Sequence, residues 1–456
     1  MLPSAFVTRM KKLLGDEYES FEEALCHGGA VRGLRVNTIK SDAKSVTSEL
    51  PTSKLPYLEN GYILNSDEPV GTHPLHHAGA IYMQDPGAMS TLAALDIGAD
   101  FKIIDLCAAP GGKSTQAAAA LGEGGFLLSN EYVGKRAKLM VGNFERLGLR
   151  GAMITSLDTS EFKKHFCEYF DLCIADVPCS GEGMFRKSED ALSMWSEENV
   201  AACAKRQAEI IENAAPLIRG GGYLLYSTCT YSLEENEMII DEFLSSHPEF
   251  SLIPVKGELV PVTSDGIVFE GAKSDTLTLC RRFYPHKSPG EGQFIALLQK
   301  EKKPQNKTTI LYKNSLKPLT KEEAAAVNEF ISDALIPGEY KAVKLGDKIV
   351  IKTHDTPPMP YGVMLYGVLL GELRGRFLVP SHHFYSAFGK CFKRQLELSE
   401  RPELLSAYLC GEQIAAPPEL GAGFCVMTYR GAVIGGGKCS GGVINNHYPK
   451  GLRNKR

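Results

Sequence analysis

Two cysteines stand in polar segments that directly follow apolar runs. Cys179 belongs to DVPCSGEGMFR (Asp176–Arg186), and Cys229 belongs to STCTYSLEENE (Ser227–Glu237). Pro178 stiffens the first segment by fixing its own φ, and the glycines beside it make the rest compliant. In the second segment the S-x-x-E spacing that begins at residue 232 predicts a capping box and a helix start. Both cysteines are therefore expected on loops at the carboxyl ends of strands in one sheet.

Thiolates placed in this way could activate a pyrimidine ring. Carbon-5 of cytosine is a poor nucleophile, but addition of a thiolate at carbon-6 turns the ring into an enamine-like species. Carbon-5 can then attack a sulfonium methyl group, after which a base must remove the carbon-5 proton and the thiolate must leave. A cysteine with an ordinary pKa of about 8.5 is only about 3% thiolate at neutral pH. Full ionisation would gain a factor of roughly thirty, or about 2 kcal/mol.

A glycine-containing loop, DLCAAPGGKST (Asp105–Thr115), follows another apolar run. Gly111 and Gly112 allow a tight turn and close approach of a ligand, and the helix that follows supplies N–H donors at its N-terminus. The loop lacks the G-x-G-x-x-G of a dinucleotide fold. It also lacks the first glycine of a phosphate-binding P-loop, because Cys107 occupies that position.

An S-adenosylmethionine pocket is the third interpretation of this loop, because that cofactor has no phosphate to be held. A carboxylate at the end of the following strand would then bind the ribose hydroxyls. Glu131 is placed for that role, and Asp158, after the next strand, could bind the adenine amine. A turn that binds no ligand is the remaining alternative.

The elements that must position these loops alternate along the chain between short apolar runs and helical segments. The runs are FKIID, GFLLSNE, AMITSLD, DLCIAD and GGYLLYST, and the helical segments are Ser114–Ala120, Val133–Leu147 and Glu197–Ile218. This alternation predicts a doubly wound, Rossmann-like α/β sheet that is mostly parallel and buried on both faces. Ligands of such sheets bind at the carboxyl ends of the strands.

We divide the chain into four regions. Residues 1–75 form a small N-terminal α+β region, and residues 76–299 form the Rossmann-like domain. A lysine-rich linker spans residues 300–315, and residues 316–456 carry short alternating strands that predict a small β-rich domain.

Composition excludes several classes of function. The 456 residues carry a formal net charge of -4 with 43% hydrophobic and 23% charged residues, so any nucleic-acid contact must come from local basic patches. The 12 cysteines include no C-x-x-C pair, which argues against a zinc site and a disulfide framework. The histidine pairs at 76–77 and 382–383 lack metal-ligand spacing, so we assign no metal. No signal-peptide core and no apolar stretch of membrane-spanning length is present, which predicts a reduced cytoplasmic location.

The motifs together resemble a known family. DLCAAPGGKSTQ, DVPCSGEGMFR, LLYSTCTYSLEENE and RFYPHKSPGEGQF, in this order, are similar to bacterial RNA cytosine-C5 methyltransferases of the Nop/Sun superfamily. The resemblance runs from about residue 31 to residue 299. The tail GGGKCSGGVINNHYPKGLR (Gly435–Arg453) resembles the PUA-like C-terminal domain of the RsmF type, which modifies 16S ribosomal RNA. The resemblance implies RNA-binding regions at both ends of the chain.

The resemblance also implies roles for single residues. Cys229 would be the nucleophile, Cys179 would assist release of the adduct, and Asp176 would contact the methionine end of the cofactor or the target base. Lys113 would lie near substrate and cofactor. The remaining cofactor-binding residues are Cys107, Ala108, Ala109, Pro110, Gly111, Gly112, Glu131, Arg136 and Asp158. One alternative stays open, because in DNA cytosine methylases the cysteine of the P-C motif is the attacking one.

RNA, in the form of 16S rRNA or the small ribosomal subunit, is the expected partner of a monomeric enzyme. A stacked cytosine must be flipped out to reach a buried pocket. Candidate phosphate contacts are Arg32, Arg35, residues 135–150, Arg186–Lys187, the linker lysines and residues 450–456, although charges on an amphipathic helix are usually just solvated. The alternatives are a tRNA cytosine-C5 methyltransferase, a different adenosylmethionine enzyme, and a non-catalytic RNA-binding assembly factor.

Overall fold

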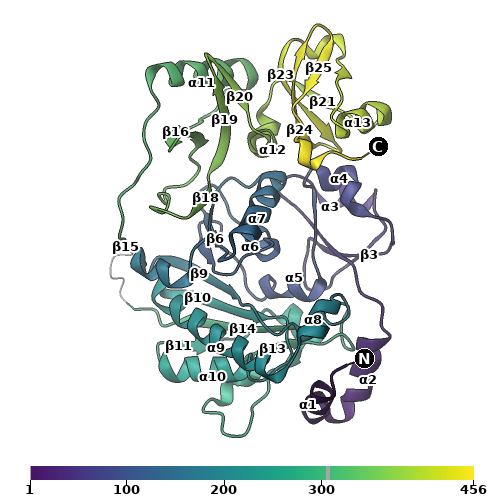
Figure 1. Ribbon diagram of the computed structural model, residues 1–456, viewed down its shortest axis with the longest axis vertical. Coiled ribbons are helices and arrows are strands. Elements are labelled where there is room, and N and C mark those ends of the chain that lie inside the picture. Colours follow the sequence, from purple (N-terminus) through teal and green to yellow (C-terminus); the bar gives the residue numbers. More distant parts are fainter. Residues whose placement is uncertain (1, 304–308, 456) are drawn as a thin grey trace.

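The structure, a computed structural model, describes residues 2–303 and 309–455. A ten-stranded mixed sheet forms its centre, with the order β12-β13-β14-β10-β9-β5-β6-β7-β18 and β11 paired to β14 (Figure 1). Its parallel strands are β5 (Lys102–Asp105), β6 (Phe126–Asn130), β7 (Ala152–Thr155), β9 (Phe170–Asp176) and β10 (Ile218–Thr228). Its antiparallel strands are β11 (Phe250–Leu252), β12 (Ser264–Asp265), β13 (Arg281–Phe283), β14 (Gln293–Lys300) and β18 (Val363–Tyr366). The predicted doubly wound α/β sheet is confirmed.

Helices cover both faces of this sheet, which is why its strands are apolar almost throughout. Consecutive side chains point to opposite faces, so Ile104 packs with α9 and α10 while Ile103 packs with α5, α6 and α7. The helices of this domain are α5 (Pro86–Leu92), α6 (Gly112–Ala118), α7 (Gly134–Leu147), α8 (Glu189–Met194), α9 (Glu197–Ala214) and α10 (Glu237–Ser246). Short 3-10 helices occupy Thr159–Lys164, Glu182–Met184, Ala215–Leu217, Gly257–Val262 and Asp275–Leu279.

One helix is shorter than the sequence indicates. We predict a helix from Glu197 to Ile218, but α9 ends at Ala214 and β10 already begins at Ile218. Pro216 lies in the intervening 3-10 turn, and proline cannot donate the backbone hydrogen bond that a longer α-helix would need.

The N-terminal region is α+β, as predicted, and forms a four-stranded sheet of order β2-β3-β1-β4. Its strands are β1 (Gly33–Val36), β2 (Thr52–Lys54), β3 (Gly61–Leu64) and β4 (Ile81–Met83). Its helices are α1 (Ser4–Leu14), α2 (Tyr18–Cys26), α3 (Ala43–Thr47) and α4 (Pro74–His77), with 3-10 turns at Gly15–Glu17 and Val70–Thr72. The two parts of this region separate in space: α1 and α2 lie beside α8, whereas α4 lies beside the end of the chain (Figure 1).

The C-terminal region contains two further sheets, of order β16-β17-β19-β20 and β21-β23-β24-β25-β22. The first comprises β16 (Ala342–Leu345), β17 (Lys348–Ile351), β19 (Val368–Arg374) and β20 (Phe377–Pro380). The second comprises β21 (Gln395–Glu397), β22 (Ile414–Ala415), β23 (Gly423–Tyr429), β24 (Ala432–Ser440) and β25 (Val443–Asn446). The helices are α11 (Lys321–Ala334), α12 (His382–Phe388) and α13 (Pro402–Leu409), with 3-10 turns at Gly389–Cys391, Pro418–Leu420 and Lys450–Leu452.

The segment predicted as a linker is partly structured. Lys300 is the last residue of β14, and β15 (Thr309–Ile310) pairs with β8 (Phe166–Cys167); residues 304–308 of this segment lie outside the described residues. Farther along, β18 pairs antiparallel with β7 and completes the central sheet. The four-region division stays a prediction, but a strand from beyond residue 316 is part of the central sheet.

In the described part of the chain, no helix combines the length and the apolar character that a bilayer crossing demands.

Candidate active site

The two cysteine loops meet at one edge of the central sheet. β9 and β10 are parallel neighbours in which Asp176 lies opposite Ser227, and each strand leads directly into its cysteine loop. The Sγ atoms of Cys179 and Cys229 lie 3.1 Å apart, and both residues are partly exposed. The loops that the sequence places at strand ends therefore bring two accessible thiols into contact.

The surroundings of the Cys179 thiol oppose its ionisation. The contact with Cys229 and, next, burial raise the pKa of the Cys179 thiol well above its usual range, and the Glu235 carboxylate adds to this. Cys179 therefore keeps its proton at neutral pH. Its S–H group can point that proton at the sulfur of Cys229.

A partly buried ion pair links the cysteine loops to the glycine-containing loop. The Nζ atom of Lys113, at the start of α6, lies 2.8 Å from Oδ2 of Asp176 at the end of β9. The other oxygen of Asp176 accepts a hydrogen bond of 2.6 Å from the hydroxyl of Ser227. Lys113 is only 9% exposed, so its charge is directed at this carboxylate rather than at solvent. The predicted residues Lys113, Asp176, Cys179 and Cys229 thus form one connected site.

The glycine-containing loop turns as the sequence predicts. Gly111 has a φ of 103°, a conformation that favours glycine, and α6 begins at the next residue, Gly112. The Ala108 N–H donates to the carbonyl of Asn130 and the Gly111 N–H donates to the carbonyl of Ala108, which fixes the loop against β6. Residues Cys107–Pro110 therefore run along the carboxyl edge of the parallel strands.

The predicted ribose and adenine carboxylates are placed differently from each other. Glu131 follows β6 directly and is buried, and its carboxylate lies 3.1 Å from Arg136, which also donates to the carbonyl of Ala109. Asp158 is exposed, and its Oδ1 accepts hydrogen bonds from Ser160 as the N-cap of the following 3-10 helix. Glu131 and Arg136 thus lie against the loop itself, and Asp158 lies at its rim.

Sequence reasoning missed the role of one carboxylate at this edge. Asp105, the last residue of β5, is fully buried; its Oδ2 accepts a hydrogen bond from Ser114 and its Oδ1 has no partner among the described residues. Burial raises the pKa of this carboxyl group to about 7. The acidic residue that ends the strand was the available signal.

The predicted capping box is wrong. α10 begins at Glu237 with Asn236 as its N-cap, and the Ser232 hydroxyl donates to Glu234 instead of accepting a backbone N–H of the helix. Glu235 is fully buried, and its carboxylate accepts hydrogen bonds from the backbone N–H and hydroxyl of Ser180. The Glu235 carboxylate, which the local spacing assigned to a helix cap, thus binds the distant Ser180 instead.

Comparison with family models identifies the family of the chain. The model for 16S rRNA methyltransferase RsmB/F matches residues 92–299. The model for the N-terminal domain of 16S rRNA methyltransferase RsmF matches residues 2–86, and the model for the methyltransferase RsmF PUA domain matches residues 393–454. The chain belongs to the 16S rRNA methyltransferase RsmB/F family.

RsmF relatives extend over the whole chain. Ribosomal RNA small subunit methyltransferase F of Vibrio vulnificus (strain YJ016) is 29% identical over 99% of this chain and 97% of its own length. The protein of the same name from Escherichia coli O9:H4 (strain HS) is 34% identical over 65% of this chain and 63% of its own.

Two solved structures from Pyrococcus horikoshii share the fold of this RsmB/F-family chain. A methyltransferase homologue matches with a TM-score of 0.56 and 25% identity, over 65% of this chain and 95% of its own. NSun6 matches with a TM-score of 0.55 and 22% identity, over 66% of this chain and 99% of its own, and this likeness concerns the fold alone. The expected PUA-like C-terminal domain is confirmed by the family models.

The N-terminal helices of this RsmB/F-family chain cover the cysteine loops. Phe21 of α2 lies edge-on to Tyr231, with ring centroids 5.0 Å apart, and Phe6 of α1 lies 5.0 Å from Phe185. Phe185 is buried in this aromatic cluster together with Trp195, so it belongs to the core rather than to a base-stacking surface. The N-terminal region thus supports the loops from behind.

Several of the basic residues predicted to touch RNA are structural instead. Arg35 is 1% exposed, because its guanidinium donates to Thr115 in α6. Arg186 is buried in an ion pair with Glu291, and Arg146 is buried with its guanidinium on backbone carbonyls. Periodicity alone did not reveal these burials, since the partner that fixes each guanidinium lies on a distant part of the chain: Thr115, Glu291 and His76.

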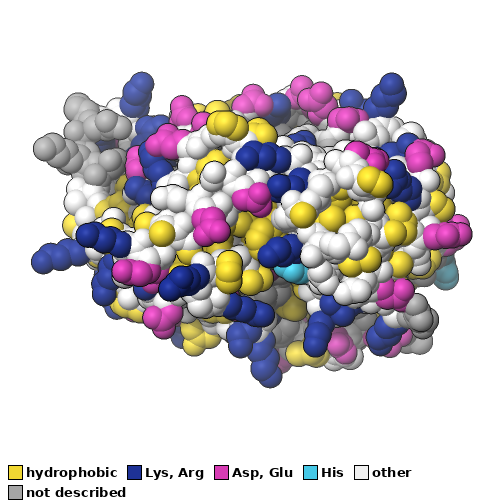
Figure 2. All heavy atoms as spheres, turned by 90° about the horizontal axis from the view of Figure 1, so that it is seen from above, with side chains coloured by type: hydrophobic (Ala, Val, Ile, Leu, Met, Phe, Trp, Pro, Cys, Tyr) yellow, Lys and Arg dark blue, Asp and Glu magenta, His cyan; other side chains and the backbone are white. Residues whose placement is uncertain are grey.

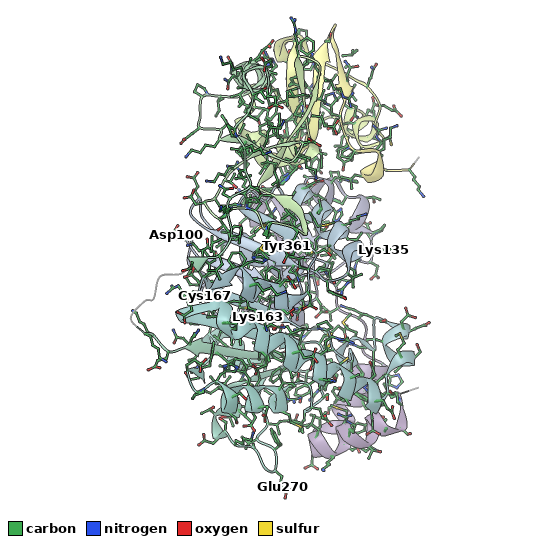
Figure 3. The ribbon with its side chains drawn as sticks, turned by 60° about the vertical axis from the view of Figure 1, so that its left-hand side comes forward. Asp100, Lys135, Lys163, Cys167, Glu270 and Tyr361 are labelled. Carbon is green, nitrogen blue, oxygen red and sulfur yellow. The ribbon has the colours of Figure 1, made fainter. Side chains whose placement is uncertain are left out.

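Other predicted phosphate contacts are accessible. Lys135 and Lys138 project from α7 into solvent, and Figure 3 shows Lys135 at the surface. The tail lysines Lys450 and Lys455 are also exposed, while Arg456 lies outside the described residues. On the face seen in Figure 2, dark blue and magenta side chains alternate, so that face carries no uniform basic field. Within residues 2–303 and 309–455, no cluster of three His, Cys, Asp or Glu residues could hold a metal ion.

Proposed function

We propose that this methyltransferase modifies carbon-5 of cytosine in small-subunit ribosomal RNA, with Cys229 as covalent nucleophile and S-adenosylmethionine as methyl donor. One observation carries the proposal: the Sγ atoms of Cys229 and Cys179 lie 3.1 Å apart beside the Lys113–Asp176 pair. A methyltransferase acting on an amino group or a ribose has no use for two accessible thiols at this place. The addition of a thiolate to a pyrimidine does.

The site fits the proposed cofactor. A buried carboxylate oxygen without a partner, Oδ1 of Asp105, is suited to an ammonium group such as that of the methionyl moiety. The left-handed Gly111 lets the loop turn sharply into α6, and Glu131 offers a carboxylate at the next strand end. Bound S-adenosylmethionine would supply an electrophilic methyl group on a positively charged sulfur. Asp158, at the rim, would take the adenine amine.

The residues of this chain would act in two stages. In the first, the Cys229 thiolate forms a bond to carbon-6 of the flipped cytosine, and the electron pair of the 5,6 double bond becomes available at carbon-5, where it would form the bond to the methyl group. The Lys113–Asp176 pair positions the polar edge of the base, because Lys113 is buried against this carboxylate and Ser227 fixes its other oxygen.

In the second stage, a base removes the carbon-5 proton, the 5,6 double bond forms again, and the carbon–sulfur bond breaks with its electrons on Cys229. Cys179, which holds its proton, donates a hydrogen bond to the departing sulfur across the 3.1 Å contact.

The substrate class follows from the relatives, which are small-subunit rRNA methyltransferases by name. We propose that residues 1–75 and 316–456 help to bind that RNA, and that the enzyme works as a monomer in the cytoplasm. The exposed lysines of α7 and of the tail are the phosphate contacts that this proposal keeps.

Two variants test the chemistry. Cys229→Ala should abolish methylation of small-subunit RNA and form no adduct, because the neighbouring Cys179 thiol keeps its proton and does not attack carbon-6. Cys179→Ala should still form the adduct but release it slowly, leaving a protein–RNA band on a denaturing gel. A band that persists in Cys229→Ala and vanishes in Cys179→Ala would reverse the two roles.

Bisulfite mapping of RNA from cells with and without the protein tests the substrate. A cytosine in 16S rRNA that loses its methyl group in the deletion strain supports the proposal. Loss confined to a tRNA would indicate a tRNA methyltransferase. Unchanged RNA methylation would leave the RNA-binding assembly factor as the interpretation.

A further inference from the structure

Two buried glutamates connect the cysteine loops. Each glutamate lies in or next to one loop and binds a residue of the other. Glu235, which follows the Cys229 loop, accepts the backbone N–H of Ser180 at 2.9 Å and also the Ser180 hydroxyl. Glu182, in the Cys179 loop, accepts the backbone N–H of Tyr231 at 3.0 Å. The four residues involved are at most 5% exposed. Ser180 directly follows Cys179, and Tyr231 lies two residues after Cys229.

Further hydrogen bonds run between the same two loops. The Gly183 N–H donates to the carbonyl of Cys229 itself at 2.9 Å, and the hydroxyls of Ser180 and Thr230 are 2.9 Å apart. Gln207 of α9 donates to the carbonyl of Pro178 and to Glu235, which connects the network to a helix that spans the sheet. The backbone on both sides of each sulfur is therefore fixed.

This arrangement is energetically costly, because it buries two carboxyl groups. Desolvation raises the pKa of Glu235 and of Glu182, and the carboxylate of Glu235 also opposes ionisation of the Cys179 thiol. If the two loops needed only to be stable, uncharged amides of the same size would fill these positions without burying charge. A carboxylate, however, accepts two donors at once, as Glu235 does from Ser180 and Gln207.

We propose that Glu235 and Glu182 are positioning residues that clamp the two loops and hold Cys179 against Cys229 for release of the RNA adduct. This inference rests on the proposed function, since it assigns the sulfur–sulfur contact to its second stage. Formation of the adduct needs only Cys229, whereas its resolution needs both sulfurs in register. Loosening the clamp should therefore slow the second stage more than the first.

Glu235→Gln is the sharpest test. The glutamine has the same shape but turns one acceptor oxygen into a donor group, which then faces Ser180 or Gln207. With a small-subunit RNA substrate and S-adenosylmethionine, we expect turnover to fall about ten- to hundredfold, the range that follows from one lost charged hydrogen bond. We also expect the protein–RNA band to accumulate on a denaturing gel. Glu182→Gln should behave in the same direction.

Glu234→Gln is the matched control, because this partly exposed neighbour pairs with Arg9 and Ser232 and, among the described residues, makes no hydrogen bond to the Cys179 loop. It should turn over like the unsubstituted enzyme. If Glu235→Gln does not fold, as judged by its thermal midpoint, Ser180→Ala replaces it in the test. This variant removes the hydroxyl that donates to the same carboxylate and contacts Thr230, and it keeps the backbone N–H bond to Glu235.

The outcomes separate this inference from the proposed function. Wild-type turnover of Glu235→Gln, or reduced turnover without accumulation of adduct, would overturn the clamp while Cys179→Ala still traps RNA. If neither the unsubstituted enzyme methylates the RNA nor Cys179→Ala traps it, the proposed chemistry itself fails.

Discussion

At the scale of single residues, Asp105 is unusual because its carboxyl group is buried and its pKa is raised. It ends β5 inside the site, its side chain is shielded from water, and one of its oxygens has no partner among the described residues. Burial raises its pKa from an ordinary value of about 3.8 to about 7. The unfolded chain therefore loses this proton at lower pH than the folded protein does. The contribution of Asp105 to stability is fully favourable below about pH 4 and declines as the pH rises to about 7.

Asp105→Asn tests that linkage. The amide cannot ionise and keeps an oxygen for the Ser114 hydroxyl, so the variant should be more stable than the unsubstituted protein above pH 7, by roughly 4 kcal/mol at most. The difference should shrink toward zero near pH 4. Denaturant unfolding at pH 4.5, 6 and 8 would measure it. A stability difference that does not change with pH would contradict the raised pKa.

At the scale of elements, features that depend on a local sequence pattern could be predicted, whereas contacts between distant segments could not. The five parallel strands and the loops after β5, β9 and β10 could be predicted, because apolar runs of strand length ending in polar residues are a local pattern. The roles of Glu235 and Arg35 could not, since a side chain that leaves its own element to bind a distant one has no sequence period. The pairing of β18 with β7 could not be predicted for the same reason, because nothing in Val363–Tyr366 indicates which strand is its partner.

Tyr366 is the residue through which we expect β18 to be held against the central sheet. It is 2% exposed, it packs against His354, and its hydroxyl donates to the carbonyl of Thr356. Tyr366→Ala should lower the free energy of unfolding by about 3–5 kcal/mol, as large-to-small core substitutions do. Phe377→Ala, which removes a ring that is 67% exposed in β20, should change it by less than about 0.5 kcal/mol. Equal effects of the two substitutions in denaturant unfolding would show that β18 adds no core.

At the scale of the whole molecule, three regions meet around buried histidines. His77 of the N-terminal region contacts the Tyr448 hydroxyl at 2.6 Å, and Lys40 donates to the carbonyl of Val433. His383 of α12 is fully buried and hydrogen-bonds to the carbonyl of Leu149 in the catalytic domain. Burial lowers the pKa of His383 to about 4. In the unfolded chain His383 is protonated below about pH 6.5, whereas in the folded protein it stays neutral down to about pH 4. The free energy of unfolding therefore declines as the pH falls from about 6.5 toward 4.

The thermal midpoint should accordingly fall between pH 7 and pH 5. At pH 5 His383 alone accounts for about 2 kcal/mol of that loss, from the distance between pH 5 and an ordinary histidine pKa of about 6.5. His383→Gln keeps an N–H donor for Leu149 and cannot take up the proton, so its loss between the two pH values should be smaller by that amount. An identical decline in both proteins would remove His383 as the cause.

The antiparallel edge strand also has a consequence for biosynthesis. β7 ends at Thr155 and its partner β18 ends at Tyr366, so 211 further residues must leave the ribosome before that edge is covered. At about 5–20 residues per second, the nascent catalytic sheet keeps an open hydrogen-bonding rim for roughly 10–40 seconds. During that interval it is exposed to the strand-to-strand association that unpaired edges invite. Arrival of the C-terminal half therefore protects an RNA-modifying enzyme while it is itself still being made.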